Sequence, residues 1–163
     1  MSIPNTHFGA QKIGELLRHA KTVFFAGIGG VSMCSLAHIT HLRGYTVCGY
    51  DRTPSTLTAQ LEGLGIRIWY ENDTAHVADA DILVYTVAIP ASLPEYAEAQ
   101  RRGIPVVSRA DYLGYIMSGY ENRIGVCGMH GKSTTTSMLE RIFRVAGDDP
   151  TVSCGAPMKD ADG

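Results

Sequence analysis

The sequence has no block of lysine and arginine residues and no strong excess of either charge. Its 14 Lys and Arg residues are balanced by 16 Asp and Glu residues, which leaves a formal net charge of −2. Nucleic acids and anionic membrane surfaces attract proteins through basic patches. We therefore expect no nucleic-acid partner and no membrane partner, and any phosphate that the protein binds must be held by a local site.

Long apolar runs are also missing. No uninterrupted apolar stretch approaches the length of a transmembrane helix, and the N-terminal stretch MSIPNTHFGAQK lacks the basic-then-apolar order of a signal peptide. These absences predict a cytoplasmic protein. The 163 residues, 45% hydrophobic and 18% charged, are enough for one complete hydrophobic core.

Paired cysteines are absent as well. The four cysteines, none of them in a C-x-x-C pair, are Cys34, Cys48, Cys127 and Cys154. Scattered cysteines are typical of reduced, mostly buried thiols. His38 and His41 lie three residues apart on a predicted helix, but the sequence offers no third ligand, so we interpret them as part of an exposed helix face rather than a metal site.

The most informative stretch that is present is IGVCGMHGKSTTT, residues 124–136. An apolar run leads into a loop with Gly128 and Gly131, followed by Lys132, Ser133 and a hydroxyl-rich helix start. The short pattern G-x-x-G-K-[ST] is typical of a phosphate-binding loop, in which backbone N–H groups and a lysine hold the phosphates and a hydroxyl ligates Mg²⁺. An ordinary strand-to-helix turn is the alternative interpretation.

A second glycine-rich turn lies near the start of the chain. A predicted strand over 22–26 leads into GIGGVSM, residues 27–33, then into a helix that stops at Gly44, and the next strand ends in Asp51. This order is Rossmann-like, with a diphosphate at the helix N-terminus and the acid near the ribose or base. Ser32 occupies the third glycine position of G-x-G-x-x-G, so a simple turn remains the alternative.

Helix and strand patterns alternate through most of the chain. Helices are predicted over residues 8–20, 56–64 and 94–102, and from a capping box of Ser108 and Asp111 to Met117; further strands are predicted over 45–50, 66–70, 80–87 and 104–107. The alternation predicts an α/β fold, a Rossmann-like parallel sheet with helices on both faces and ligands at the carboxyl ends of the strands.

The stretch GYEN, residues 119–122, has the composition of a boundary. We predict a first domain over residues 1–119 and the beginning of a second, ATP-binding domain over residues 120–163. The second contains a strand over 124–127, the phosphate loop, a helix over 132–146 and a short strand over 151–154. So few elements cannot bury both faces of a parallel sheet, and we interpret this domain as truncated.

Several stretches together resemble the Mur ligases, over nearly the whole chain from Thr22 onward. They are FAGIGGVSM, GYD at 49–51, TVAIP at 86–90, RGIPVVSRADYL at 102–113 and GMHGKSTTT. The resemblance implies an N-terminal Rossmann-like domain for the UDP part of the substrate, a central ATP-binding domain and a C-terminal domain that brings the amino acid. The doubled glycine Gly29-Gly30 favours the member that joins L-alanine to UDP-N-acetylmuramate over the murein-peptide recycling ligase.

The resemblance also implies roles for individual residues. The residues implied for UDP binding are Gly27, Ile28, Gly29, Gly30, Val31, Ser32, Met33, Asp51, Asn72, Thr86, Ala88 and Ile89. Those implied for ATP binding are Gly128, Met129, His130, Gly131, Lys132, Ser133 and Thr134, with Lys132 and Ser133 in catalytic roles and Ser133 as the Mg²⁺ ligand. Four residues depart from the family pattern. Met129 and Ser133 each stand in place of a usual threonine, Asn72 stands in place of a common histidine near the uridine, and Leu93 stands in place of an asparagine helix cap.

The implied reaction belongs to peptidoglycan precursor synthesis. ATP would phosphorylate the lactyl carboxylate of UDP-N-acetylmuramate, and the amine of L-alanine would attack the acyl phosphate. Two alternatives stay open from the residues alone. An NAD(P)-dependent oxidoreductase would use Gly27–Ser32 and Asp51 but would leave the Gly131-Lys132-Ser133 loop without a role, and a non-catalytic nucleotide-sugar-binding module would need only the first loop. We expect a polypeptide of these 163 residues to be inactive as a ligase on its own.

Overall fold

The computed structural model describes residues 3–155. The chain divides into two compact units, the residues up to Glu121 and the residues from Asn122. The division predicted from the sequence, after residue 119, lies beside this point in the same GYEN stretch.

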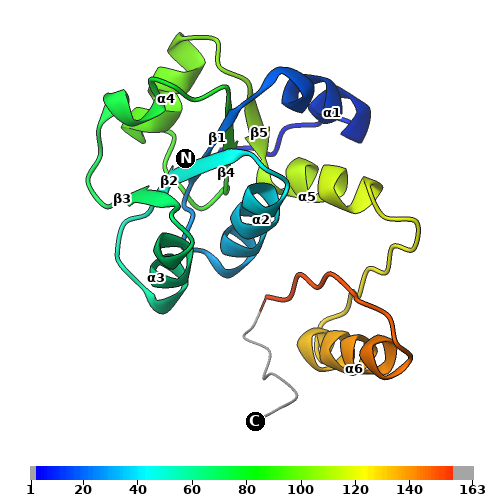
Figure 1. Cartoon of the computed structure of the whole chain (residues 1–163). Coiled ribbons are helices and arrows are strands. Elements are labelled where there is room, and N and C mark those ends of the chain that lie inside the picture. The colour runs from blue at the N-terminus through cyan, green and yellow to red at the C-terminus, as the bar shows by residue number, and fades with distance from the viewer. Residues whose placement is uncertain (1–2, 156–163) are drawn as a thin grey trace. The chain divides into compact units, whose positions relative to one another are not determined.

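The first unit is built on a parallel sheet of five strands in the order β3-β2-β1-β4-β5 (Figure 1). The strands are β1 (Thr22–Ala26), β2 (Thr46–Tyr50), β3 (Arg67–Trp69), β4 (Ile82–Tyr85) and β5 (Val106–Ser108). Ala26 is in register with Tyr50 on one side and with Tyr85 on the other, so the carboxyl ends of the central strands lie level. The chain moves outward from β1 to β3 and then returns to β4, which creates a crevice beside the end of β1 where ligands of such sheets bind.

Helices cover both faces of the sheet, as predicted. They are α1 (Ala10–His19), α2 (Val31–Leu42), α3 (Thr56–Gly63), α4 (Pro94–Arg101) and α5 (Arg109–Ser118), with a short 3₁₀ helix, η1 (Thr74–Val77). The predicted α/β fold class is therefore confirmed, and the predicted elements of this unit are all present, with ends that shift by a few residues.

Side chains that alternate along β1 divide the core into two layers. Val23 and Phe25 pack with residues of α1, α2 and α5, whereas Phe24 and Ala26 pack with residues of α4 and η1. Burial on both faces explains why the strands are apolar throughout instead of alternating with polar residues. In the first layer the Thr40 hydroxyl donates to the Leu36 carbonyl at 2.7 Å, which leaves it to accept from the Tyr112 hydroxyl at 2.9 Å.

The segment before α1 is tied to α5 through Asp111. The Asp111 carboxylate accepts hydrogen bonds from the Thr6 hydroxyl, at 2.6 Å, and from the Phe8 N–H, at 2.8 Å. The predicted capping box is only half formed: Ser108 Oγ accepts from the Asp111 N–H, but the Ser108 N–H donates to Thr6 Oγ1. Thr6, which is distant in sequence, has thus replaced the Asp111 side chain as the acceptor for the Ser108 N–H.

The second unit contains the predicted helix, α6 (Lys132–Val145). The two strands predicted beside it, over 124–127 and 151–154, were wrong, because the described part of this unit forms no strand. A strand needs a neighbour to satisfy its backbone groups. None of the described residues after Asn122 provides one, and no residue of α6 is buried. The end of the predicted tail, residues 156–163, lies outside the described residues.

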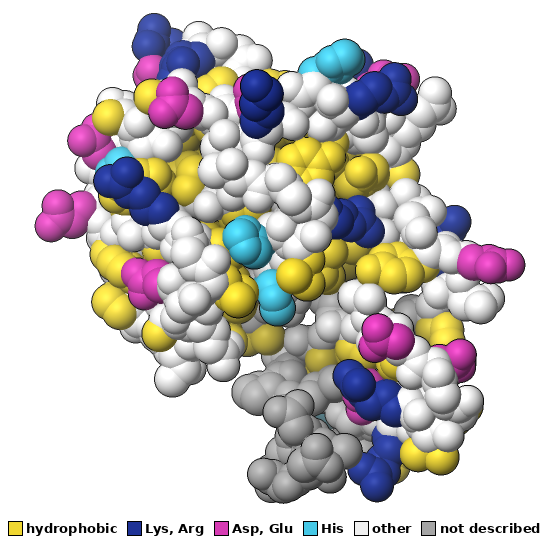
Figure 2. Space-filling view, in the orientation of Figure 1, with side chains coloured by type: hydrophobic (Ala, Val, Ile, Leu, Met, Phe, Trp, Pro, Cys, Tyr) yellow, Lys and Arg dark blue, Asp and Glu magenta, His cyan; other side chains and the backbone are white. Residues whose placement is uncertain are grey.

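The surface carries both charges. On the face in Figure 2, Lys and Arg side chains are interspersed with Asp and Glu side chains, without a continuous basic area. Within residues 3–155, no helix is both long enough and apolar enough to cross a bilayer.

Gly49 in β2 is needed because two other parts of the chain approach it closely. A Cβ atom at this position would lie 2.5 Å from the carbonyl oxygen of Phe25 and 2.9 Å from Ile28 Cδ1. The Phe25 carbonyl belongs to the neighbouring strand, so it cannot move without disturbing the sheet.

We predict that Gly49→Ala lowers the free energy of unfolding by about 1 to 3 kcal/mol, because the added methyl group overpacks the contact between β1 and β2. Urea denaturation of the purified protein measures the change. Gly63→Ala in α3 is the matched control: its Cβ would meet nothing within 4 Å, so stability should stay the same or rise by up to about 1 kcal/mol. Equal stability of the two variants would contradict the packing argument.

Candidate nucleotide-binding site

A cavity of about 710 Å³ opens at the carboxyl edge of the sheet. Residues that follow each of the five strands line it, because parallel strands bring their carboxyl ends to one edge. The lining residues that were expected from the sequence are Gly27, Gly29, Gly30, Val31, Ser32, Met33, Asp51, Asn72, Thr86, Ala88 and Ile89. The structure therefore brings together eleven of the twelve residues implied for the UDP group.

Ile28 is the exception. Its side chain is fully buried in the first core layer, against Gly49, and does not line the cavity. A branched apolar residue between glycines serves here to anchor the turn to the core.

Several backbone N–H groups of the glycine turn are already used within the protein. The N–H groups of Gly27 and Ile28 both donate to the carbonyl oxygen of Tyr50, at 2.8 and 3.0 Å, and the Gly30 N–H donates to the Gly27 carbonyl at 3.2 Å. With the Gly29 N–H, which donates to Asp51 Oδ2, the N–H groups of residues 27–30 all have acceptors within the protein.

Asp51 supplies the acceptor for the remaining glycine. Its Oδ2 accepts from the Gly29 N–H at 2.7 Å, and its Oδ1 lies 3.4 Å from the Thr53 N–H. The sequence suggested that this acid contacts a ribose or base. In the structure its carboxylate braces the turn, and it also lines the cavity with the lone pairs that remain.

The donors that stay available belong to the first turn of α2. No residue in the described range 3–155 accepts from the N–H groups of Val31, Ser32 and Met33, and the first helical bond runs from the Cys34 N–H to the Gly30 carbonyl. These groups and the positive end of the helix dipole favour an anion.

Arg109 adds a full positive charge at the same place. Its Nη1 donates to Ser32 Oγ at 3.2 Å, and the guanidinium lines the cavity. The residue is the first of α5 and follows β5, on the opposite side of β1 from Asp51 and β2. Sequence analysis did not assign it a role, although an arginine directly after a strand that ends at this edge was a usable signal.

Asn72 lies at the other end of the cavity, after the edge strand β3. Its Oδ1 is 3.4 Å from the Tyr50 hydroxyl, and its Nδ2 donates to Glu95 Oε2 at 3.2 Å. The buried side chains of Ile89 and Leu93 also line the cavity. The cavity thus combines a cationic end that suits phosphate, an amide at the other end that suits a flat polar ring, and some apolar wall.

The second glycine loop lies in the second unit. Gly131 is the N-cap of α6 with a left-handed φ of 78°, a conformation that favours glycine. The Lys132 ammonium donates to the carbonyl oxygens of Gly128 and Met129, at 2.6 and 3.1 Å, so it is held over the loop. The Met129 side chain is 86% exposed, and His130 is exposed beside it.

The residues of this loop fit a nucleotide phosphate with its Mg²⁺. The N–H groups of Lys132, Ser133 and Thr134 have no acceptor in the described part of the chain, and the exposed Ser133 provides a hydroxyl at the start of α6. A hydroxyl oxygen together with phosphate oxygens is the kind of ligand set that Mg²⁺ accepts. Elsewhere among residues 3–155, no group of three or more His, Cys, Asp and Glu side chains could hold a metal ion.

The fold and the first site define a doubly wound α/β protein, with a parallel sheet, a cavity at the point where the strand order reverses and a helix N-terminus beside an arginine. Residues 22–121 match the model of the family described as "Mur ligase family, catalytic domain". The chain belongs to the Mur ligase family.

Curated relatives and solved structures agree with this assignment. The chain is 46% identical over 134 residues to the UDP-N-acetylmuramate–L-alanine ligase of Agathobacter rectalis, which covers 82% of the chain and 29% of that protein. It is 44% identical over 138 residues to the enzyme of the same name from Acetivibrio thermocellus. That match covers 85% of this chain and 29% of the relative. The chain thus spans less than a third of the length of these relatives.

Among solved structures, the UDP-N-acetylmuramate-alanine ligase of Thermotoga maritima superposes with a TM-score of 0.74 at 28% identity, over 79% of this chain and 30% of that one. The UDP-N-acetylmuramate:L-alanyl-γ-D-glutamyl-meso-diaminopimelate ligase of Neisseria meningitides has a TM-score of 0.72 at 32% identity, over 78% and 40%. Membership of a ligase family decides against the NAD(P)-dependent oxidoreductase that the first loop alone left open.

We predict that Asp51→Ala lowers the free energy of unfolding by about 1 to 3 kcal/mol, because the half-buried Gly29 N–H loses its acceptor. Thermal or urea unfolding followed by circular dichroism measures this. Asp79→Ala is the control, since this exposed carboxylate accepts no hydrogen bond from the described residues; its stability should change by less than about 0.5 kcal/mol. A neutral Asp51→Ala variant would show that the brace is unimportant.

Proposed function

We propose that the first unit binds the UDP group of UDP-N-acetylmuramate, and that the protein belongs to an ATP-dependent ligase that joins L-alanine to this substrate. One observation carries the proposal: unpaired N–H groups of α2 and the Arg109 guanidinium meet at one end of a cavity large enough for a nucleotide. The names of the similar ligases support the choice of substrate.

A diphosphate suits the α2 end because its charge is compensated there by three backbone donors and one arginine. The Ser32 hydroxyl, already bonded to Arg109, can donate its proton to a phosphate oxygen. Arg52 also lines the cavity and is exposed, so it can approach the same group. Because the net charge of the chain is −2, this local arrangement, rather than a general basic surface, must attract the anion.

The second unit supplies the residues for ATP in this proposal. Lys132 would move from the loop carbonyls to the β- and γ-phosphates, and the N–H groups of Lys132, Ser133 and Thr134 would hold the phosphate oxygens. Mg²⁺, bound through Ser133, would neutralise charge on the phosphates so that a carboxylate can approach them.

The reaction proposed for the whole enzyme is the family reaction. The lactyl carboxylate of the sugar would take the γ-phosphoryl group of ATP, and the amine of L-alanine would then attack the acyl phosphate, giving an amide, ADP and phosphate. We assign no described residue to L-alanine. Precursor synthesis from nucleotide substrates is in keeping with a cytoplasmic location, which we infer for the protein.

We predict that calorimetry detects binding of UDP-N-acetylmuramate but not of NAD. Arg109→Ala should weaken binding of the UDP-sugar roughly 10-fold to 100-fold, because a charge-assisted contact to the diphosphate is lost. Arg101→Ala is the control, since Arg101 lies on α4, pairs with Glu98 and does not line the cavity. Binding of NAD without binding of the UDP-sugar would refute the proposal.

We also predict that a polypeptide of residues 1–163 shows no ATP-dependent ligation, because the helix that follows the phosphate loop has no buried residue and so no packed domain around it. A coupled assay for ADP, with UDP-N-acetylmuramate and L-alanine present, measures this. In that case the chain by itself acts as a nucleotide-sugar-binding module. ADP release that depends on L-alanine would contradict the prediction.

A further inference from the structure

Glu95 is a completely buried carboxylate that neither of the proposed phosphate sites uses. It is the second residue of α4 and is 0% exposed. Three donors satisfy it: the Asn72 side-chain amide at 3.2 Å, the Asp73 backbone N–H at 3.0 Å and His76 Nδ1 at 3.1 Å. Burying a carboxylate is costly unless it is hydrogen-bonded. Glu95 therefore needs these three partners, and its hydrogen bonds in turn fix the positions of their donor groups.

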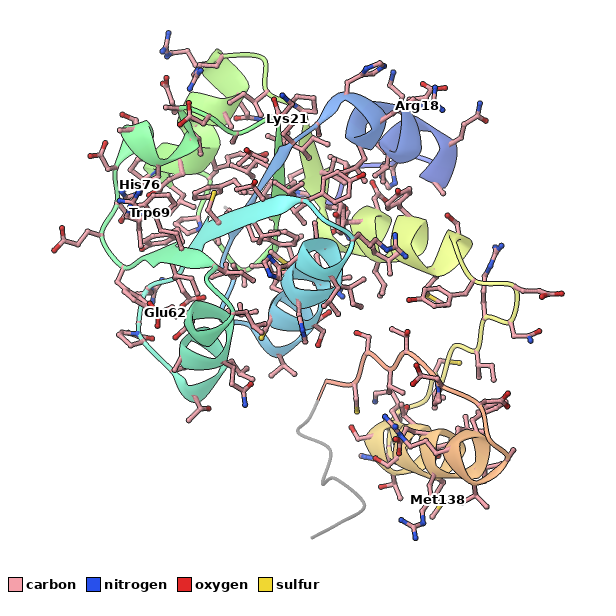
Figure 3. The ribbon with its side chains drawn as sticks, in the orientation of Figure 1. Arg18, Lys21, Glu62, Trp69, His76 and Met138 are labelled. Atoms are coloured by element: carbon pink, nitrogen blue, oxygen red, sulfur yellow. The ribbon has the colours of Figure 1, made fainter. Side chains whose placement is uncertain are left out.

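The two oxygens of Glu95 have different partners. Oε1 receives both Asp73 N–H and His76 Nδ1. The backbone N–H cannot change its role, and the His76 ring is held by stacking on Trp69, with ring centres 4.4 Å apart and an interplanar angle of 18° (Figure 3). Only Oε2 is left, and it faces Asn72.

This geometry determines which way the Asn72 amide points. A carboxylate only accepts hydrogen bonds, so the nitrogen of the amide must face Glu95 and its oxygen must face away, toward the Tyr50 hydroxyl. Asn72 also lines the cavity. The Asn72 amide, which could otherwise flip, is therefore held in one orientation, so its oxygen and its nitrogen each have a defined position for a bound ring.

We propose that Glu95 is a positioning residue that selects uracil over cytosine through Asn72. The inference rests on the proposed function, because it assumes that a pyrimidine nucleotide occupies the cavity. Uracil offers an N–H at N3 between two carbonyl oxygens, whereas cytosine offers a bare N3 beside an amine. In its fixed orientation, the Asn72 carbonyl oxygen can accept from uracil N3–H while the remaining Asn72 N–H donates to a uracil carbonyl oxygen. Cytosine in the same position would place its unprotonated N3 against the Asn72 oxygen and its amine against the Asn72 N–H, so neither hydrogen bond could form.

The substitution Glu95→Gln tests this with almost no change in shape. The Asp73 backbone N–H still requires an oxygen at the position of Oε1, so the new amide nitrogen must take the position of Oε2, where it faces the nitrogen of Asn72. Two donors cannot pair, and Asn72 must flip so that its oxygen accepts from Gln and its nitrogen donates to the Tyr50 hydroxyl, which can accept. The order of donor and acceptor shown to the base is then reversed.

The experiment compares UDP and CDP binding by calorimetry to the whole chain. We expect the wild type to favour UDP at least about tenfold and Glu95→Gln to reduce that ratio roughly five- to tenfold, mainly through weaker UDP binding. Glu98→Gln on the same helix is the matched control and should keep the ratio, because Glu98 pairs with Arg101 and does not line the cavity. Nitrogen-15 NMR of the free protein should show a shifted Asn72 side-chain amide signal in Glu95→Gln and not in the control.

The possible results distinguish the positioning role of Glu95 from the proposed function of the cavity. An equal loss of UDP and CDP affinity in Glu95→Gln, or a wild type without a preference, would overturn the positioning role while leaving the binding site intact. No binding of UDP to the wild type would overturn the proposed function and the inference with it. If Glu95→Gln does not fold, Asn72→Ala decides, since it removes the selecting amide; an unchanged ratio in that variant would overturn the inference.

Discussion

The first unit depends on the pair of hydrogen bonds that the Tyr50 carbonyl oxygen accepts. This carbonyl group ends β2 and accepts the N–H groups of both Gly27 and Ile28, which joins the turn after β1 to the neighbouring strand. Ile28 can then enter the core only because Gly49 leaves space for it, and Asp51 secures the next residue of the turn. With the turn closed on the protein, the first N–H groups without an acceptor among the described residues are those at the start of α2.

The cavity shows how a parallel sheet builds a recognition site from distant segments. Arg109 follows β5 and Asn72 follows β3, at opposite edges of the sheet, yet both line the same cavity as the start of α2. One end is cationic and suits phosphate; the other carries an amide whose orientation a buried glutamate determines. Binding strength and selectivity for a base can therefore arise from different residues, which is a common division in ligand sites.

The two units differ in how complete they are as folded structures. The first has two core layers around its sheet and contains the whole matched family region, residues 22–121. In the second, the loop has the donors that a phosphate needs, but no residue of α6 is buried. Local chemistry is present there without the packing that normally holds such a loop, because a glycine turn and a helix start form from local sequence whereas a core needs further elements.

Sequence alone determined the order of elements in the first unit, the parallel sheet, the family and most of the cavity lining, because apolar periodicity, glycines and helix stops are local signals. It failed for the strands over 124–127 and 151–154, since pairing depends on a neighbour that the pattern does not reveal. Only the tertiary structure decided that Ile28 faces the core, that Asp51 braces the turn, that Asp111 binds the N-terminal segment, that Arg109 lines the cavity and that Glu95 contacts Asn72. Each of these roles is a hydrogen bond or a contact between residues more than 20 positions apart, and it forms only when the strands of the sheet bring them to one edge.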